Sequence, residues 1–363
     1  MVTLNWHSGT GYDFFVSLYV LHHPDEFGLR PSWAAGVRSR LPAEQREFLE
    51  RAQGYAHVPL TWLASLPLEK RDALDVIQAL GDLSPEKRLE ILLAPYDAPA
   101  DLVQIIRSIS SKGQWNVADL EAVKSVYARR YSALHGEALT HLCDACAQAS
   151  QFGRQYVEVL QSYYQAFFAE EEERIRPVLK KGMEEARRMA VGLDPAELVE
   201  RLSRGVQLPK LNELVELDLA PSYWSSPLIF YNPTGPGRAQ LLYGVRPDPA
   251  GLVPGENVPV GLVEMLKALA DPTRLRILRY LSQEPSTPSQ LSRRLRLRAP
   301  TVVHHLKDLR LAGLVQVALQ VEGEKRYALR REALQSMNYL LEEFLAGELP
   351  DAEAPEKSGG RIE

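Results

Sequence analysis

The chain has 363 residues, of which 45% are hydrophobic and 25% charged, and its formal net charge is −5. This composition is ordinary for a globular protein and leaves room for two or three domains. No apolar run is long enough to span a membrane, and the N-terminal residues lack the basic and apolar regions of a signal peptide. Cys143 and Cys146 are too few for a disulfide framework. We therefore expect a cytoplasmic protein without a membrane partner.

Helical periodicity dominates the first 205 residues. Ser84 and Asp194 each precede a proline, which is typical of a capped helix start. In the longest segment, glutamates of the acidic run Glu170–Glu173 precede arginines by four residues, so we expect a solvated helix face rather than a metal site. Pro177 should kink or end this helix. Residues 1–205 are therefore predicted to form a helical domain.

The periodicity changes after residue 205. Three short β-rich runs, ELVELDLA, SPLIFYN and AQLLYGVR, alternate with the turn-forming stretches PSYWSS and PTGPGR. This pattern predicts a small antiparallel sheet within residues 206–250 that packs on the helical domain. The stretch RPDPAGLVPGENVP then indicates a connector to a further domain. The predicted fold class is mainly α with small antiparallel β elements.

Residues 262–329 carry the clearest functional pattern. Asp271 precedes a proline and predicts a helix start. Thr287 also precedes a proline, and Gln290 follows three residues after this cap, which predicts a second start with a capping box. The residues expected on one face of the first helix are Leu275, Leu278 and Leu281.

A third helix is expected to open at Pro300 and to end at Gly313. Two strand-like runs, VQVALQ and KRYAL, follow, and Gly323 lies between them in a loop. The helices and the hairpin thus come in the order of a winged helix-turn-helix domain, which binds DNA. The residues that repeat at helical spacing along the third helix are Val302, Leu306 and Leu309.

Charge supports the same interpretation. Residues 271–331 hold 13 Lys and Arg against 5 Asp and Glu, a local balance of +8, which leaves −13 for the rest of the chain. Positive charge concentrated in one module of an acidic chain is typical of a nucleic-acid-binding protein, although a merely solvated helix face can also be rich in arginine.

The stretch LKALADPTRLRILRYL, followed by PTVVHHLKDLRLAGLV, resembles the ArsR-type family of bacterial winged-helix repressors over about the last quarter of the chain. The resemblance implies a homodimer that places two recognition helices in successive major grooves of double-stranded DNA. It also implies that terminal helices, here VGLVEMLKALA and EALQSMNYLLEEFLAG, pair the protomers. We accordingly predict a DNA-binding and dimerisation domain over residues 251–349 and a disordered tail over residues 350–363.

Two departures from the family pattern matter. The stretches TPSQLSRRLRL and REALQSMNYLLEEF contain no Cys and no His, so neither a metal site at the family's usual positions nor a cofactor is expected. The family often has Ser and Gln before the proline of the recognition helix, where this chain has Arg298 and Ala299. A cation there opposes the helix dipole, which makes sense if Arg298 meets a phosphate or a guanine edge.

Eight residues are predicted to contact DNA. The first two turns of a recognition helix reach base edges, whereas cations farther along the helix and on the wing meet phosphates. Of the two adjacent histidines, one should face DNA and the other should lean on the preceding helix, and helical position favours the second for DNA. An ordinary solvated position is the alternative for Arg310. The predicted base contacts are Arg298, Thr301, His304 and His305, and the predicted phosphate contacts are Lys307, Arg310, Lys325 and Arg326.

The N-terminal domain resembles a region found ahead of the winged helix in long ArsR-type regulators, through FFVSLYVLHHPDEFGLRPSWAAGVRSRL and LAPSYWSSPLIFYN. This resemblance implies a sensing role. Aromatic residues at helical spacing either enclose a small apolar effector or simply form the core. No second ligand pair exists for a zinc site with Cys143 and Cys146, and a thioredoxin-like site would need a preceding strand, which is absent. We therefore expect structural burial of the two thiols, with a thiol switch as the alternative. The aromatic residues are Trp6, Trp33, Trp62, Trp115, Tyr127, Tyr131, Tyr156, Tyr163 and Tyr164.

The function predicted is that of a ligand-responsive, dimeric transcription regulator, most simply a repressor. The sequence leaves repressor against activator open. The alternative is an enzyme or interaction domain fused to a winged helix, but none of the GxSxG, P-loop, HExxH or dinucleotide-binding motifs is present, so we expect no enzyme. Constitutive autorepression without a ligand is a third hypothesis.

Overall fold

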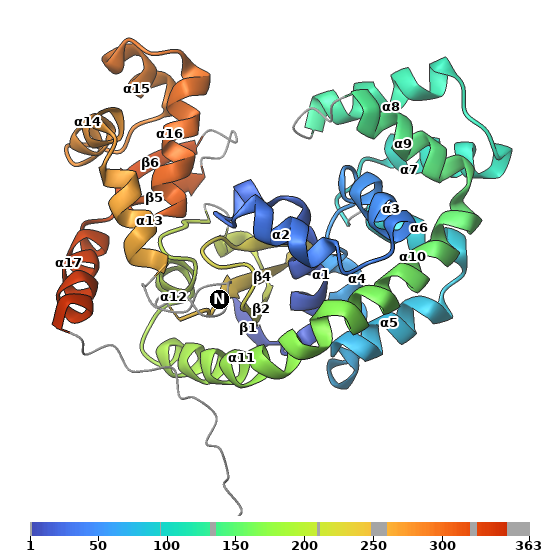
Figure 1. Ribbon diagram of the computed structural model, residues 1–363, viewed down its shortest axis with the longest axis horizontal. Coiled ribbons are helices and arrows are strands. Elements are labelled where there is room, and N and C mark those ends of the chain that lie inside the picture. Colours follow the sequence, from blue (N-terminus) through green and yellow to red (C-terminus); the bar gives the residue numbers. More distant parts are fainter. Residues whose placement is uncertain are drawn as a thin grey trace, which may run out of the picture. The chain divides into compact units, whose positions relative to one another are not determined.

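The computed structural model describes residues 2–94, 96–130, 136–208, 211–247, 260–319 and 325–346. The chain divides into two compact units, an N-terminal unit over Met1–Arg246 and a C-terminal unit over Pro247–Glu363 (Figure 1). Both consist mostly of helices with a small sheet, so the predicted fold class is confirmed. The predicted tail, residues 350–363, lies outside the described residues.

Helices account for most of the N-terminal unit. Two capped starts were predicted, and both are confirmed: Ser84 accepts a hydrogen bond from the Lys87 amide, and Asp194 forms a capping box with Glu197. The helices are α1 (Thr10–His22), α2 (Pro31–Arg38), α3 (Ala43–Gln53), α4 (Leu60–Ser65), α5 (Ala73–Asp82), α6 (Pro85–Leu93), α7 (Ala100–Lys112), α8 (Val117–Arg130), α9 (Gly136–Ala147), α10 (Ala149–Tyr163), α11 (Ala169–Ala190) and α12 (Pro195–Leu202). Short turns are η1 (Pro24–Glu26), η2 (Leu68–Lys70), the π-turn η3 (Tyr164–Phe168) and η4 (Leu211–Glu213).

The long helix α11 corrects two expectations. It does not end at Pro177, because the proline lies on the exposed side, where water can bind the carbonyl oxygen that loses its partner. A kink at Pro177 stays a prediction. The acidic run is only half solvated, since Glu171 and Glu172 are buried. Arg174 binds Glu171 with two nitrogens at 2.6 and 3.0 Å, and Arg176 donates to Glu172 at 3.0 Å. Glu172 also accepts a hydrogen bond from the Thr10 hydroxyl of α1, which ties α11 to that helix.

The sheet of the N-terminal unit is mixed, with strand order β1-β2-β4-β3. Its strands are β1 (Thr3–Trp6), β2 (Glu216–Ser222), β3 (Phe230–Gly235) and β4 (Arg238–Gly244). Only β3 and β4 pair antiparallel as expected, whereas β1–β2 and β2–β4 are parallel. The prediction missed β1, because four residues are too few to reveal an alternating pattern. The sheet thus joins the first residues of the chain to the segment predicted as 206–250.

One face of this sheet is apolar and packs on α11 and α12 (Figure 1). Leu217 and Leu241 belong to one buried cluster with helix residues such as Ala186 and Leu198. Alternation along the strands places polar side chains on the opposite face, where Asp218 lies beside Gln240 in register and both are buried.

Buried polar groups on that opposite face form a hydrogen-bond network around Arg71. Its guanidinium donates to Tyr12 Oη at 2.9 Å, to His7 Nδ1 at 2.6 Å, and to the carbonyl oxygens of Ala64 and Leu66. The acceptor role of Nδ1 puts the His7 proton on Nε2, 3.6 Å from Asp218 Oδ1. Burial lowers the pKa of His7. The network therefore holds a neutral histidine and fixes α1 against the sheet.

A second buried carboxylate, Asp13, holds the loop after β2. It accepts hydrogen bonds from Ser222 Oγ at 2.7 Å and from the amides of Tyr223 and Trp224 at 3.1 and 2.8 Å. Burial raises the pKa of Asp13 to about 6, although these donors oppose the shift. The loop leads to the Ser226–Pro227 peptide bond, which is cis.

The C-terminal unit has the predicted order of helices and hairpin. Asp271 caps its helix by accepting from the Arg274 amide at 2.8 Å, and Thr287 and Gln290 form the predicted capping box at 2.8 and 3.2 Å. The hairpin is antiparallel, and residues 320–324, with Gly323, lie outside the described residues. The elements are α13 (Val260–Leu269), α14 (Pro272–Leu281), α15 (Pro288–Leu295), α16 (Ala299–Leu311), β5 (Val315–Leu319), β6 (Lys325–Leu329) and α17 (Arg331–Ala346).

The core of this unit corrects one detail. Leu278 and Leu281 are buried as expected, but Leu275 is 49% exposed and Ile277 takes the buried position on α14. The helical phase explains the difference, because Ile277 and Leu281 are four residues apart and share a face. Val302, Leu306 and Leu309 of α16 are fully buried. This apolar stripe fixes which side of α16 faces outward.

Candidate nucleic-acid interface

The turn between α15 and α16 sets the direction of the recognition helix. Ser292 Oγ donates to the Leu297 carbonyl oxygen at 2.6 Å, and the Leu297 amide donates to the Ser292 carbonyl oxygen at 3.1 Å. Between them Arg296, the C-cap residue of α15, has a left-handed backbone at φ 56° and ψ 41°. A side chain there costs about 1 kcal/mol relative to glycine.

Helix α16 presents a polar strip opposite its buried stripe. Arg298 is its N-cap residue and makes no capping hydrogen bond within the described part of the chain, as the sequence indicated. The helix begins at Ala299, one residue earlier than predicted. Arg298, Thr301, His304 and Lys307 are all exposed. Four of the eight predicted contacts therefore lie together on the outer side of α16.

The two histidines differ in exposure. His304 is exposed, and its Nε2 lies 3.8 Å from Asp308 Oδ2. His305 is half-buried, and its Nδ1 is buried without a hydrogen-bond partner among the described residues. Exposure therefore favours His304 for an outward contact, contrary to our preference from helical position. DNA contact by either histidine stays a prediction.

The predicted phosphate contacts also divide by exposure. Lys307, Lys325 and Arg326 are exposed and form no ion pair with another described residue. Arg310 is half-buried near Tyr327, and burial lowers its pKa. Its guanidinium is therefore partly covered by the unit itself. This burial matches neither a fully exposed phosphate contact nor an ordinary solvated position.

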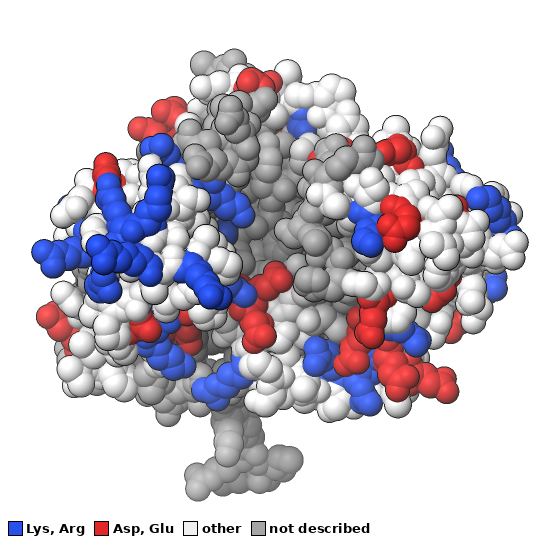
Figure 2. All heavy atoms as spheres, turned by 90° about the horizontal axis from the view of Figure 1, so that it is seen from above, with Lys and Arg blue, Asp and Glu red and all other residues white. Residues whose placement is uncertain are grey.

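Other cations of this unit serve the fold. Arg274 binds Asp308 at 2.6 Å and the carbonyl oxygens of Lys267 and Ala268, which ties α14 to α13 and α16. Arg294 pairs with Glu284. By contrast, two cations that the sequence analysis did not select, Arg293 and Arg296, are exposed and have no ion pair among the described residues. They surround the same turn, and Lys and Arg gather on this unit, at the left of Figure 2.

An exposed apolar residue on α16 was also missed. Val303 is 48% exposed although its neighbours Val302 and Leu306 are buried. Apolar groups on a recognition helix can contact the methyl group of thymine. The sequence pattern did not reveal that Val303 is exposed, because it directly follows another valine, Val302, which belongs to the core.

No group of three or more His, Cys, Asp or Glu side chains in the described segments is arranged to hold a metal ion. Cys143 and Cys146 lie fully buried on α9. Burial raises the pKa of Cys143 to about 11 and raises the pKa of Cys146 as well. Both thiols are therefore held in the unreactive protonated form, which favours packing over a thiol switch. Among the described helices, none is both long and apolar enough to cross a membrane.

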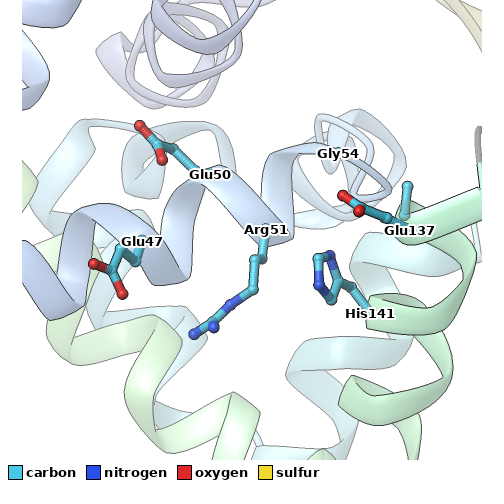
Figure 3. A pocket seen from close by; sticks show the side chains of 7 residues that line it. Glu47, Glu50, Arg51, Gly54, Glu137 and His141 are labelled. Atoms are coloured by element: carbon cyan, nitrogen blue, oxygen red, sulfur yellow. The ribbon is translucent and has the colours of Figure 1, made fainter.

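The N-terminal unit has an open hollow of about 390 Å³ between α3 and α9 (Figure 3). Arg51 of α3 and His141 of α9 point into the space between the helices, whereas Glu50 points away from it. The lining is charged and includes none of the aromatic residues considered for an apolar ligand. Of these, Tyr127, Tyr156 and Tyr163 are buried core residues, and Tyr131 lies outside the described residues. The residues that line the hollow are Glu47, Glu50, Arg51, Gly54, Glu137, Ala138 and His141.

Comparison with known proteins agrees with this geometry. The model of the bacterial regulatory protein, arsR family, matches residues 271–317, from the cap of α14 into β5. An uncharacterized HTH-type transcriptional regulator of Methanocaldococcus jannaschii is 36% identical over 66 residues, which are 18% of this chain and 70% of the relative. The chain belongs to the ArsR family of helix-turn-helix regulators. This ArsR-family protein is therefore a DNA-binding transcriptional regulator, as predicted.

Proposed function

We propose that this regulator is a homodimeric repressor that reads its operator with two copies of α16. The observation that carries the proposal is the exposed strip of Arg298, Thr301, His304 and Lys307 on α16. Arginine, threonine and histidine can bond to base edges in the major groove. Lys307, together with Lys325 and Arg326 of the wing, neutralises phosphates and positions the helix.

An exposed apolar surface on the terminal helices supports the homodimer. Leu266 of α13 is 42% exposed, and Tyr339 and Leu345 of α17 are 61% and 74% exposed. Helices α13 and α17 contact each other, so these residues belong to neighbouring helices of one unit. Pairing with a second copy would bury them and set two recognition helices one turn of DNA apart.

In this proposal the N-terminal unit senses an effector and changes operator affinity. The charged hollow between α3 and α9 supports a polar ligand better than the apolar one predicted from the aromatic residues. Repression follows if the unliganded dimer binds DNA and covers a promoter. An effector that favours a second conformation would then release it.

The test is fluorescence anisotropy with DNA from upstream of the protein's own gene and a scrambled duplex, across a salt series. Wild-type protein should prefer the upstream DNA. His304→Ala should reduce this preference about 10-fold, as expected for the loss of one base contact. Lys307→Ala should weaken binding to both duplexes. It should also lower the salt slope, which is the slope of the logarithm of the binding constant against the logarithm of the salt concentration, by about 0.9 per protomer.

Lys181→Ala is the control, since Lys181 is an exposed cation on α11 of the N-terminal unit and is not a predicted DNA contact. It should leave the salt slope nearly unchanged. Equal binding of both duplexes by wild-type protein at every salt concentration would contradict sequence-specific recognition. A monomer at concentrations that saturate the operator, measured by sedimentation, would contradict the homodimer.

A further inference from the structure

Arg296 occupies a position that glycine or asparagine would fill with less strain. At φ 56° its Cβ crowds the backbone, and the bonds between Ser292 and Leu297 hold the turn in this shape. The chain therefore keeps a bulky residue at the one position of this turn where a side chain is unfavourable. The fold does not require it, because Ser292 and Leu297 close the turn through other atoms.

The Arg296 side chain also makes no polar contact with the part of this unit that the structure describes. It is exposed, and it has no hydrogen bond or ion pair with another described residue. Its surroundings are cationic, because Arg293 and Arg298 are exposed nearby in sequence, while the acidic Glu284 is already bound by Arg294. No carboxylate among the described residues pairs with Arg293, Arg296 or Arg298, so the arrangement is explained best by an external anion.

We infer that Arg296 binds a DNA phosphate beside the groove that α16 enters. This inference rests on the proposed function. Arg296 lies two residues before Arg298, the N-cap residue of α16, and residues 298–301, which include two predicted base contacts, are all exposed. A guanidinium can hold one phosphate with two parallel hydrogen bonds, which fixes direction as well as distance. The turn would then set the entry angle of the recognition helix on DNA.

The test compares three substitutions in the full-length protein. Arg296→Gly and Arg296→Asn both suit a left-handed backbone and remove the charge, whereas Arg296→Lys keeps the charge. Both neutral variants should bind upstream and scrambled DNA about 8-fold more weakly per lost contact at 0.1 M salt and lower the salt slope by about 0.9 per protomer. Their melting temperatures should equal or exceed that of the wild type. Arg296→Lys keeps the charge and should keep the wild-type salt slope, but it should bind more weakly than the wild type because an ammonium cannot form the two parallel hydrogen bonds of a guanidinium.

Arg204 provides a control with the same backbone geometry. It is an arginine with φ 56° at the end of α12, in the N-terminal unit. Arg204→Gly should leave DNA affinity and salt slope unchanged.

Unchanged affinity and slope in both neutral variants would overturn the inference and leave the proposed function intact, because the wild type is titrated alongside. A loss in Arg296→Gly that Arg296→Asn does not share would also overturn it, since turn flexibility would then be the cause. Absence of any DNA binding by the wild type would remove the proposed function and this inference together.

Discussion

The two units use arginine in opposite ways. In the N-terminal unit Arg71 and Arg88 are buried, and their guanidinium groups bind backbone carbonyl oxygens of other helices. In the C-terminal unit Arg296 and Arg298 are exposed and have no ion pair in the described segments. The same residue type thus stabilises the fold where it is buried and leaves positive charge on the surface of the C-terminal unit where it is exposed without a partner. Burial and partners, rather than residue type, separate a structural arginine from one that is available to a ligand.

The largest expected effects come from replacing one arginine in each unit and comparing the changes in stability and in DNA binding. Arg71→Met should destabilise the N-terminal unit by about 4 kcal/mol, because Tyr12 and two carbonyl oxygens lose buried donors. Arg298→Ala should change stability by less than about 0.5 kcal/mol but weaken operator binding about 10-fold. Chemical denaturation and anisotropy measure the two effects. Similar stability losses in both variants would break the contrast.

Close packing in the N-terminal unit provides the next largest effect. A Cβ atom at Gly153 of α10 would lie 2.0 Å from the Pro85 carbonyl oxygen of α6, whereas nothing lies within 4 Å of one at Gly36 of α2. Gly153→Ala should therefore cost about 3 kcal/mol, because the clash is with backbone. Gly36→Ala should be neutral or stabilising by up to about 1 kcal/mol. Equal melting temperatures for the two variants would refute this packing argument.

A pH series sharpens the comparison for acidic groups. The pKa of Asp13 is raised to about 6 from an ordinary value of 3.8, so the folded state binds the proton more tightly than the unfolded state. The protonated Asp13 carboxyl therefore contributes up to about 3 kcal/mol to the free energy of unfolding. This contribution is fully present below about pH 4 and is lost as the pH rises through 6. The unfolding free energy of wild type minus that of Asp13→Asn should fall across this window. A difference that stays flat between pH 4 and 7 would contradict it.

The smallest effect concerns Val303. Val303→Ser should lower affinity about 3- to 10-fold only for operators with thymine at the contacted position, because the serine hydroxyl replaces an apolar contact with the methyl group. Stability should hardly change, since the side chain is half exposed. Replacing that thymine with uracil should abolish the difference between the two proteins. A uniform loss on every duplex would assign Val303 to the fold instead.

The sequence predicted the features that depend on neighbouring residues. The caps at Asp271 and Thr287 require only a side chain and an amide three residues apart, so local chemistry was sufficient. The pairing of β1 with β2 could not be read in this way, because the partners are remote in sequence. Arg296 gave no turn signal, since glycine normally marks a left-handed residue. Which of His304 and His305 points outward depends on the rotation of α16 about its axis. Hydrophobic periodicity predicts this rotation only to within one residue.

The strand β1 has a consequence for how the protein is made. Asn5 bonds to Asp218, which is 213 positions later in the chain. At typical rates of synthesis this separation corresponds to a delay of about 10 to 40 s, during which the first strand has left the ribosome without its partner. A shortened protein that starts at α1 would leave the edge of β2 open to strands of other chains, and aggregation is the expected result.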